Sequence, residues 1–352
     1  MTEEAPKPHK RRVRYLGKNP RRFDQKYKEL DPAKYAGDVA HIIAKGLTPA
    51  GTHRPICVKE ILEVLRPAPG AVCLDATLGY GGHAKELLAR ILPGGKLFAV
   101  DVDPLELPKT EARLRALGYG EKVLIVRKMN FAGIAALAPE AGGGFDCVLA
   151  DLGVSSMQLD NPERGFTYKA EGPLDLRLNP ERGRPAAELL RSVSAAALEK
   201  ILFEYADEPY ARIIALAVKD SPLPIRTTAE LAAAVRSGLK KADGKLEEDV
   251  VKKSLQRTFM ALRIAVNEEL SVLDRFLEIL PWCLRPGGRA AILSFHSGED
   301  RRVKKAFLRG EAAGVYSSVA ASPIRPSSEE RHSNPRSACA KLRWAIRSDQ
   351  QN

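Results

Sequence analysis

Cysteine is scarce in this chain of 352 residues, and its five cysteines are scattered without any C-x-x-C pair. A disulfide framework uses an even number of cysteines at close spacings, and the usual zinc sites use paired ligands. The sequence therefore predicts neither, and it shows no cluster of metal-ligating residues. We expect buried thiols in a reducing compartment and no bound metal.

Long apolar runs are also absent. No segment approaches the ~18 consecutive apolar residues of a membrane-spanning helix, and basic residues follow Glu3 and Glu4 where a signal peptide would have an apolar region. Hydrophobic residues nevertheless reach 44%, which is typical of a globular protein. These features predict a cytoplasmic protein with no membrane partner.

Acidic residues are outnumbered, because 56 Lys and Arg against 44 Asp and Glu give a formal net charge of +12. Such an excess favours a polyanionic partner, and nucleic acid is the first candidate. Residues 1–50 form a basic N-terminal extension, in which the cluster Lys10–Arg14 is followed by Tyr15 and further aromatics. The extension either contacts RNA or only keeps the protein soluble, and the sequence leaves both interpretations open.

Short segments rich in Val, Leu and Ile alternate with helical patterns from His53 onward, which predicts a parallel sheet with helices on both faces. We expect strands at Ala71–Ala76, Lys96–Val102, Lys122–Val126, Asp146–Ala150, Arg289–Phe295 and Lys341–Arg347. A helical pattern without Gly or Pro covers Leu246–Leu280, as one helix or two. The alternation stops after Gly153, so we predict an inserted helical domain at residues 158–249 between the two parts of an α/β domain, residues 51–157 and 250–352.

The segment Leu74–His83 (LDATLGYGGH) predicts a strand that runs into a glycine-rich turn and then into a helix. Glycines allow a ligand to approach the backbone, and a helix N-terminus offers N–H donors to it. Asp101 ends the next predicted strand, where a carboxylate can accept the hydroxyls of an adenosine ribose. This pattern fits a nicotinamide dinucleotide as well as S-adenosylmethionine, and Asp101 could instead only cap the following helix.

Two further strand ends carry candidate residues. Phe131 follows the third strand and either lies along an adenine ring or packs in the core. Asp151 ends the fourth strand, at the edge where open α/β sheets bind ligands. A carboxylate in this position can accept a hydrogen bond from an amine, so Asp151 is the candidate catalytic residue.

These motifs resemble those of the bacterial small-subunit rRNA methyltransferase H family, also called MraW. The resemblance covers about His53 to Arg347 and rests on segments that occur in the family's order, namely Asp75–His83, Asp151–Asp160, Arg164–Phe166, Gly172–Asp175, Thr258–Asn267, His296–Arg301 and Asn334–Ser337. It implies a class I, Rossmann-like S-adenosylmethionine methyltransferase sheet with a helical insertion after the fourth strand. It also implies methylation of the exocyclic N4 amine of a decoding-centre cytosine in 16S small-subunit rRNA, within a largely assembled small subunit.

The resemblance assigns the binding of S-adenosylmethionine to seven residues, namely Gly81, Gly82, His83, Asp101, Phe131, Asp151 and Gln158. Three segments depart from the family pattern: Asp175–Leu178 reads DLRL in place of Asp-Met-Arg-Met, Gly298 replaces a leucine, and Ala206–Arg212 differs at its start. The cofactor segments are unchanged. The departures therefore concern the substrate rather than the class of reaction.

Our hypothesis for the chemistry is that Asp151, helped by the turn Ser155–Ser156, accepts a hydrogen bond from the N4 amine while the base is extruded. Many amino-methyltransferases place an Asn/Asp-Pro-Pro-aromatic element here, and this chain lacks it, so Asp151 could instead serve the methionine end of the cofactor. Candidate RNA contacts are Arg164, Arg177, Arg257, Arg263, His296 and Arg336, together with Arg301, Lys341 and the N-terminal extension. For each of them the alternative is an ordinary internal or solvated contact.

Two rival functions are left open by the residues alone. A nicotinamide-dependent oxidoreductase would explain Gly79, Gly81 and Asp101, but not the segment Asp151–Asp160 or the basic loops. A non-catalytic RNA-binding or ribosome-assembly protein would explain the charge, but it would not need Asp101 and Asp151 together. The oligomeric state is not determined by the sequence, and a homodimer is one option.

Overall fold

The computed structural model describes residues 55–243 and 246–349, and every structural statement below concerns these residues. The chain divides into two compact units, Met1–His53 and Arg54–Asn352. The predicted basic extension, residues 1–50, therefore lies outside the described residues. No helix within the described ranges is long and apolar enough to cross a membrane.

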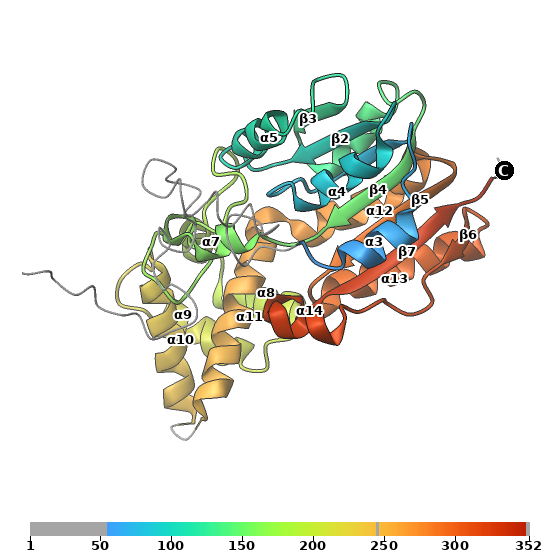
Figure 1. Cartoon of the computed structure of the whole chain (residues 1–352). Coiled ribbons are helices and arrows are strands. Elements are labelled where there is room, and N and C mark those ends of the chain that lie inside the picture. Colours follow the sequence, from blue (N-terminus) through green and yellow to red (C-terminus); the bar gives the residue numbers. More distant parts are fainter. Residues whose placement is uncertain (1–54, 244–245, 350–352) are drawn as a thin grey trace, which may run out of the picture. The chain divides into compact units, whose positions relative to one another are not determined.

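A seven-stranded sheet forms the centre of the unit Arg54–Asn352, with the strand order β3-β2-β1-β4-β5-β7-β6 (Figure 1). Neighbouring strands are parallel from β3 to β5, whereas β7 is antiparallel to both β5 and β6. The strands are β1 (Val72–Asp75), β2 (Lys96–Asp101), β3 (Leu124–Lys128), β4 (Phe145–Asp151), β5 (Leu284–Ser294), β6 (Tyr316–Val319) and β7 (Lys341–Arg347).

The central parallel strands are buried on both faces, which is why their sequences are continuous apolar runs. In β2, for example, the four residues Leu97–Val100 are all buried. The strands expected at Lys96–Val102, Asp146–Ala150 and Lys341–Arg347 are confirmed to within one residue at each end. β3 lies two residues later than predicted.

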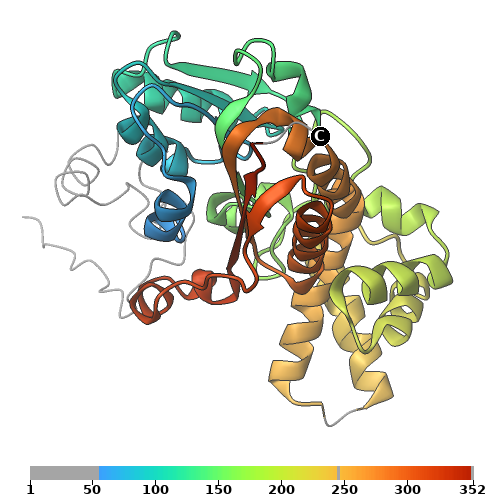
Figure 2. The same cartoon turned by 90° about the vertical axis from the view of Figure 1, so that its right-hand side faces the viewer.

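Helices cover both faces of the sheet, and Figure 2 shows the strands between the two helical layers. One face packs against η2 (Phe131–Leu137), α12 (Glu269–Cys283) and α13 (Ser297–Ala312). The other face packs against α3 (Val58–Leu65), α4 (Gly82–Ile91) and α5 (Leu107–Ala116). The predicted α/β class is therefore confirmed.

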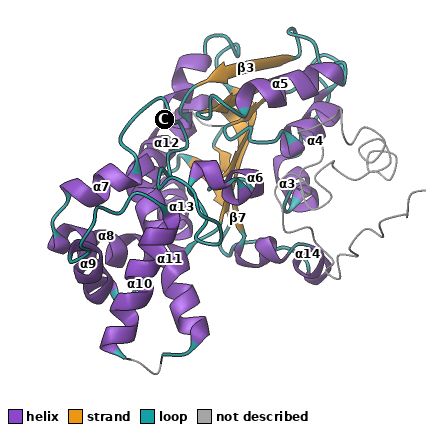
Figure 3. Cartoon of the chain, turned by 90° about the vertical axis from the view of Figure 1, so that its left-hand side faces the viewer, coloured by secondary structure: helices purple, strands orange, loops and turns teal. Residues whose placement is uncertain are grey.

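The segment between β4 and β5 is helical and has a hydrophobic core of its own. Its helices before α12 are α6 (Ser156–Asp160), η3 (Pro162–Arg164), α7 (Ala186–Ser192), α8 (Ala195–Ala206), α9 (Ala211–Lys219), α10 (Thr228–Ala242) and α11 (Glu248–Asn267), and Figure 3 shows α8 to α11 gathered beside one another. Among the described residues this segment contributes no strand to the sheet. The insertion after the fourth strand is thus observed, and its boundaries at residues 158 and 249 stay a prediction.

Two local features differ from a simple reading of the sequence. The helical pattern Leu246–Leu280 is two helices, because Glu268 adopts a left-handed backbone with φ of 50° between α11 and α12. Strand β6 was not predicted, since its four residues YSSV carry too short an apolar pattern. The short helices α14 (Ser328–Ser333) and η4 (Pro335–Cys339) precede β7.

Candidate active site

Three aspartates end three neighbouring parallel strands, namely Asp75 on β1, Asp101 on β2 and Asp151 on β4. β1 pairs with both β2 and β4, so the three carboxylates meet at the same edge of the sheet. Burial raises the pKa of Asp75 to about 6, although the nearby His83 opposes this shift. Three acidic groups in a buried region predict a site that favours positive charge or hydrogen-bond donors.

The glycine-rich turn after β1 is held by contacts with β2 and α5. Gly79 donates its N–H to Asp101 Oδ2 over 2.8 Å, and Thr110 Oγ1 donates to Gly79 O over 2.7 Å. Gly81 has a φ of 78°, and a Cβ atom there would lie 3.0 Å from Thr110 Cγ2. Only glycine adopts a positive φ without strain and has no Cβ atom to collide with Thr110. Gly82 is the first residue of α4, and a Cβ atom there would lie 3.1 Å from Pro55 Cβ.

Asp101 accepts backbone hydrogen bonds with both carboxylate oxygens, since Oδ2 bonds to Gly79 N and Oδ1 accepts the N–H of Asp103 over 2.9 Å. Burial raises the pKa of Asp101, and these N–H groups partly offset that effect. Each carboxylate oxygen offers a second lone pair. Asp101 can therefore still accept the hydroxyl groups of a ribose.

His83 connects the segment before α3 with the end of β4. Its Nε2 lies 2.9 Å from Ile56 O, and because a carbonyl only accepts, Nε2 carries the proton. Burial lowers the pKa of His83 and so favours the neutral ring. The unprotonated Nδ1 then lies 3.5 Å from Asp151 Oδ2. His83 thus borders the carboxylate that the sequence marks as catalytic.

Asp151 is held by its backbone but keeps one carboxylate oxygen free. Its N–H donates to Thr77 Oγ1 over 2.7 Å. The side chain is 28% exposed, yet Oδ1 is buried and has no hydrogen-bond partner among the described residues. Burial, and then the charge of Glu299, raises the pKa of Asp151 to about 7. A buried acceptor without a partner costs about 1–3 kcal/mol, so a ligand that donates to it binds favourably.

Gln158 and Arg164 converge on the buried carboxylate of Asp103. Gln158 Nε2 donates to Asp103 Oδ2 over 2.7 Å, and Arg164 Nη1 donates to the same oxygen over 2.8 Å. Arg164 also donates to the carbonyls of Arg177 and Leu178. This network links the β2–α5 turn to the insertion. The hydrogen bonds of Arg164 are used within the fold, so it is not among the RNA contacts that we propose below.

Phe131 begins η2 and packs edge to face against Phe276, with ring centroids 5.1 Å apart. Its side chain is only partly buried. One side of the Phe131 ring therefore packs in the core, as one of the two interpretations of the sequence expected. Contact of this ring with an adenine stays a prediction.

Arg301 is exposed, and the other four predicted arginines fall into two groups. Arg263 forms a two-pronged ion pair with Glu269, and Arg177 forms one with Asp175, and both side chains are largely buried. Arg257 is 38% exposed, with Nη1 3.9 Å from the buried Glu208, and Arg336 is 42% exposed, with Nη2 2.8 Å from Asp160. Arg257 and Arg336 are thus the more accessible of these cations.

His296 is the N-cap residue of α13, just beyond the end of β5. Its side chain is 10% exposed, and its Nε2 lies 3.2 Å from Glu299 Oε1. β5 pairs with β4 in a register that sets Leu293 beside Asp151. The structure therefore brings His296 to the same edge of the sheet as the three aspartates.

Residues 50–348 match the model of the MraW methylase family. The chain belongs to the MraW methylase family. It is 54% identical over 340 residues to ribosomal RNA small subunit methyltransferase H 2 of Alkaliphilus metalliredigens, which covers 96% of this chain and 97% of the relative. It is 51% identical over 352 residues to ribosomal RNA small subunit methyltransferase H 1 of Agathobacter rectalis, covering 99% and 100%. A solved SAM-dependent methyltransferase from Aquifex aeolicus is 12% identical, with a TM-score of 0.36 and coverage of 92% and 97%.

Family membership makes this chain a methyltransferase and confirms the class I α/β fold expected from its motifs. The rival interpretation as a nicotinamide-dependent oxidoreductase is wrong. The order β3-β2-β1-β4-β5 is shared with dinucleotide-binding sheets, but the antiparallel β7 inserted between β5 and β6 departs from their parallel pattern.

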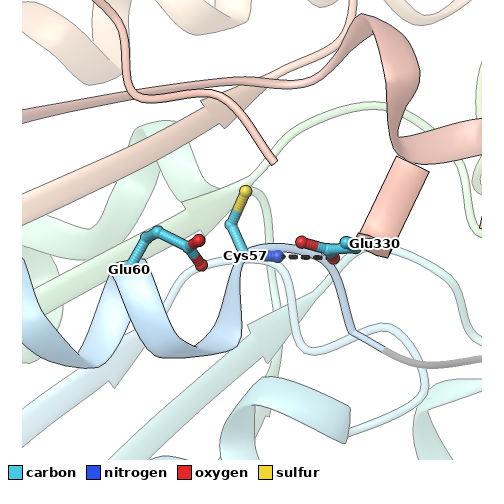
Figure 4. Close-up of side chains that lie close together, drawn as sticks. All are labelled: Cys57, Glu60 and Glu330. Atoms are coloured by element: carbon cyan, nitrogen blue, oxygen red, sulfur yellow. Dashed lines mark hydrogen bonds between the residues drawn. The ribbon is translucent and has the colours of Figure 1, made fainter. Parts of the chain in front are cut away.

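One group of side chains in the described ranges of this methylase has the composition of a metal site. The thiol of Cys57 and carboxylate oxygens of Glu60 and Glu330 lie within 4.8 Å of one another (Figure 4). However, Glu330 Oε1 accepts the N–H of Cys57 over 2.9 Å, and burial together with the two glutamates raises the pKa of the thiol to about 12. Glu330 thus already has a partner within the fold, and we assign no ion to this group.

Two residues of this methylase site were missed by the sequence analysis. Asp103 lies two residues after Asp101 and gathers four hydrogen bonds, from Leu105 N, Glu106 N, Gln158 and Arg164. Glu299 stands three residues after His296, the spacing of a capping box, and its charge acts on Asp151. These spacings were the available signals, but they are common, and only the fold shows what the two carboxylates contact.

Proposed function

We propose that this methylase transfers a methyl group to the exocyclic N4 amine of a decoding-centre cytosine in small-subunit rRNA. S-adenosylmethionine is the methyl donor, and when bound it supplies an electrophilic methyl group on a sulfonium. Relatives that align over nearly their full length carry the name ribosomal RNA small subunit methyltransferase H, which supports rRNA as the substrate. The buried, unpartnered Oδ1 of Asp151 is the observation that supports an amine as the acceptor.

The residues at the sheet edge suit this cofactor. Asp101 offers lone pairs for ribose hydroxyls, and the turn at Gly81 and Gly82 brings the N-terminus of α4 to the same edge. Phe131 can stack on the adenine, and the acidic group of Asp75 and Asp151 favours the positive sulfonium. Gln158 acts through Asp103, because its side chain is bonded there.

Asp151 is the residue that we assign to the chemistry. The N4 lone pair is delocalised into the ring, so the amine must be oriented and must lose a proton as it gains the methyl group. The N4–C bond forms while the sulfur–methyl bond breaks, the bonding pair stays on sulfur, and the N4 proton moves to Asp151 Oδ1 and then to solvent. Placement of the reacting atoms contributes several kcal/mol to such a displacement.

Contacts with the rRNA are assigned to the accessible cations. Arg301 and Arg336 are exposed members of the predicted set, and the Arg257 side chain is 38% exposed. The excess of basic residues, 56 against 44 acidic ones, provides a favourable field for an RNA. We further propose that an assembled small subunit in the cytoplasm is the substrate, and that a homodimer is compatible with it. A non-catalytic assembly factor is the alternative, which the following assay tests.

The deciding experiment is methyl transfer from labelled S-adenosylmethionine to small subunits that lack the modification, followed by nucleoside analysis. The expected product is N4-methylcytidine at the decoding centre. Another methylated nucleoside would overturn the substrate assignment. No transfer despite cofactor binding would favour the non-catalytic alternative.

Asp151→Asn is the matched variant, since it keeps the shape of the side chain. We expect kcat to fall by about 100-fold or more, the usual effect of losing a proton acceptor, whereas cofactor binding by calorimetry should weaken much less, because Asp101 and the glycine-rich turn remain. Full turnover by Asp151→Asn would remove Asp151 from the mechanism.

A further inference from the structure

Among the buried polar atoms that have no hydrogen-bond partner within residues 55–243 and 246–349, two lie at the carboxyl ends of the neighbouring parallel strands β4 and β5. One is Asp151 Oδ1 at the end of β4, and the other is His296 Nε2, two residues beyond the end of β5. The β4–β5 register sets Leu293 beside Asp151, so His296 follows three residues later on the adjacent strand end. The charge of Glu299, which contacts the His296 ring, also acts on Asp151. The two unpartnered atoms therefore belong to one neighbourhood.

The atom of His296 is a hydrogen-bond donor. His296 and Glu299 stand at the spacing of a capping box at the start of α13. Glu299 Oε1 lies 3.2 Å from Nε2, and because a carboxylate only accepts, the proton of the neutral ring resides on Nε2. The carboxylate thus sets the tautomer, but its contact does not have the geometry of a hydrogen bond, and Nε2 has no other partner among the described residues.

The atom of Asp151 is a hydrogen-bond acceptor. Its companion oxygen, Oδ2, faces His83 Nδ1 at 3.5 Å, and its backbone is fixed by Thr77 Oγ1. The bond to Thr77 fixes the backbone from which the carboxylate projects, and Oδ1 itself is buried. The fold thus presents one buried acceptor atom and one buried donor atom at the edge where we place the reaction.

We propose that His296 Nε2 and Asp151 Oδ1 together read the amino edge of the target base, with Asp151 accepting the N4–H of cytosine and His296 donating to ring nitrogen N3. This inference rests on the proposed function and adds a specificity-determining residue to it. Cytosine presents a donor next to an acceptor on this edge, whereas uracil and guanine present the reverse. Adenine has the same pattern as cytosine, so its exclusion depends on the size of the purine.

The pair also orients the amine. A base held at N3 and at one N4–H cannot rotate in its own plane, and the remaining lone pair of N4 then faces one direction. The base also binds more tightly because it gives a partner to two buried groups, each of which carries a desolvation penalty while it is unpaired. His296 touches the base at N3 and not at the reacting amine.

The first test compares His296→Phe with His296→Gln on small subunits, with cofactor binding measured for both. His296→Phe keeps a ring but has no donor, and we expect kcat/KM to fall roughly 10- to 100-fold. His296→Gln retains an amide donor and should keep activity within about fivefold of the native enzyme. Both should bind S-adenosylmethionine as the native protein does, since His296 is not among the cofactor residues. Native activity in His296→Phe would overturn the proposal.

The second test changes the substrate, so it does not depend on how the variants fold. Small subunits are reconstituted with 3-deazacytidine at the target position, which removes the N3 acceptor and keeps the N4 amine. The kcat/KM of the native enzyme should fall as much on this substrate as the kcat/KM of His296→Phe falls on cytosine. His296→Phe acting on 3-deazacytidine should show no further fall. Normal methylation of 3-deazacytidine by the native enzyme would refute the contact. Absence of N4-methylcytidine from the native reaction on cytosine would instead refute the proposed function itself.

Discussion

Asp151 illustrates how position in the fold sets the chemistry of one residue. An exposed aspartate is ionised well below neutral pH, whereas burial and Glu299 raise the pKa of Asp151 to about 7. Other titratable groups that act on this region are His83 on α4, Asp75 on β1 and Cys57 before α3. Asp151 therefore changes its charge near neutral pH.

A pH profile follows from this shift. Asp151 accepts the amine proton as a carboxylate, so kcat/KM should rise as the pH increases through about 7 and then level off. Removing the negative charge with Glu299→Gln lowers the pKa of Asp151 and should move the midpoint to lower pH. Initial rates between pH 5.5 and 9 would measure both. A midpoint that stays in place or moves upward in Glu299→Gln would show that another group controls the profile.

Single residues were predicted from the sequence to different extents. Asp101 and Asp151 could be placed because a strand end in a parallel sheet has a known location. Arg164 could not, since a buried arginine and an RNA-binding arginine look alike until the partner, here Asp103, is seen. The orphaned atoms of Asp151 and His296 depend on side-chain geometry, which no spacing encodes.

At the scale of elements, the Asp103 network joins the end of β2 to the insertion. Arg164 is buried with Asp103 and also bonds the chain around Leu178, so it bridges two pieces of the molecule that are distant in sequence. Removing one member of a buried ion pair leaves the other charge without compensation. The network is therefore a sensitive point for stability.

We expect Arg164→Met to lower the free energy of unfolding by about 3–5 kcal/mol, measured by urea denaturation. The control is Arg127→Met, whose pair with Glu140 is about half exposed and should contribute no more than about 1 kcal/mol. Equal effects of the two substitutions would mean that the Asp103 network does not hold the insertion to the sheet.

The elements themselves were largely predictable, because their apolar patterns are long. Exceptions arose where local geometry overrides the pattern. Glu268 divides a continuous helical pattern through a left-handed backbone, and β6 forms only because β7 offers it an antiparallel partner. Neither event has a strong signal in the local sequence.

At the scale of the whole molecule, the basic excess predicts how binding to the small subunit depends on salt. Each phosphate contact releases about one counterion, so the slope of log K against log salt concentration should become shallower by roughly 1 when one contact is lost. Arg336→Ala should show this change in binding assays from 50 to 200 mM salt. Arg90→Ala, in the last turn of α4 at the opposite edge of the sheet, should not. Equal slopes for Arg336→Ala and the native protein would remove Arg336 from the interface.

The hydrogen bond from Cys57 N to Glu330 Oε1 joins residues 273 positions apart, and the neighbouring Ile56 O fixes His83 beside Asp151. During synthesis the first of these residues is made long before the last, and β7, the strand that links β5 to β6, follows later still. A growing chain therefore has to wait for Glu330 and for β7 before Cys57 and Glu330 can meet beside the site. The capacity to transfer a methyl group should arise late, as one of the last events in the making of the molecule.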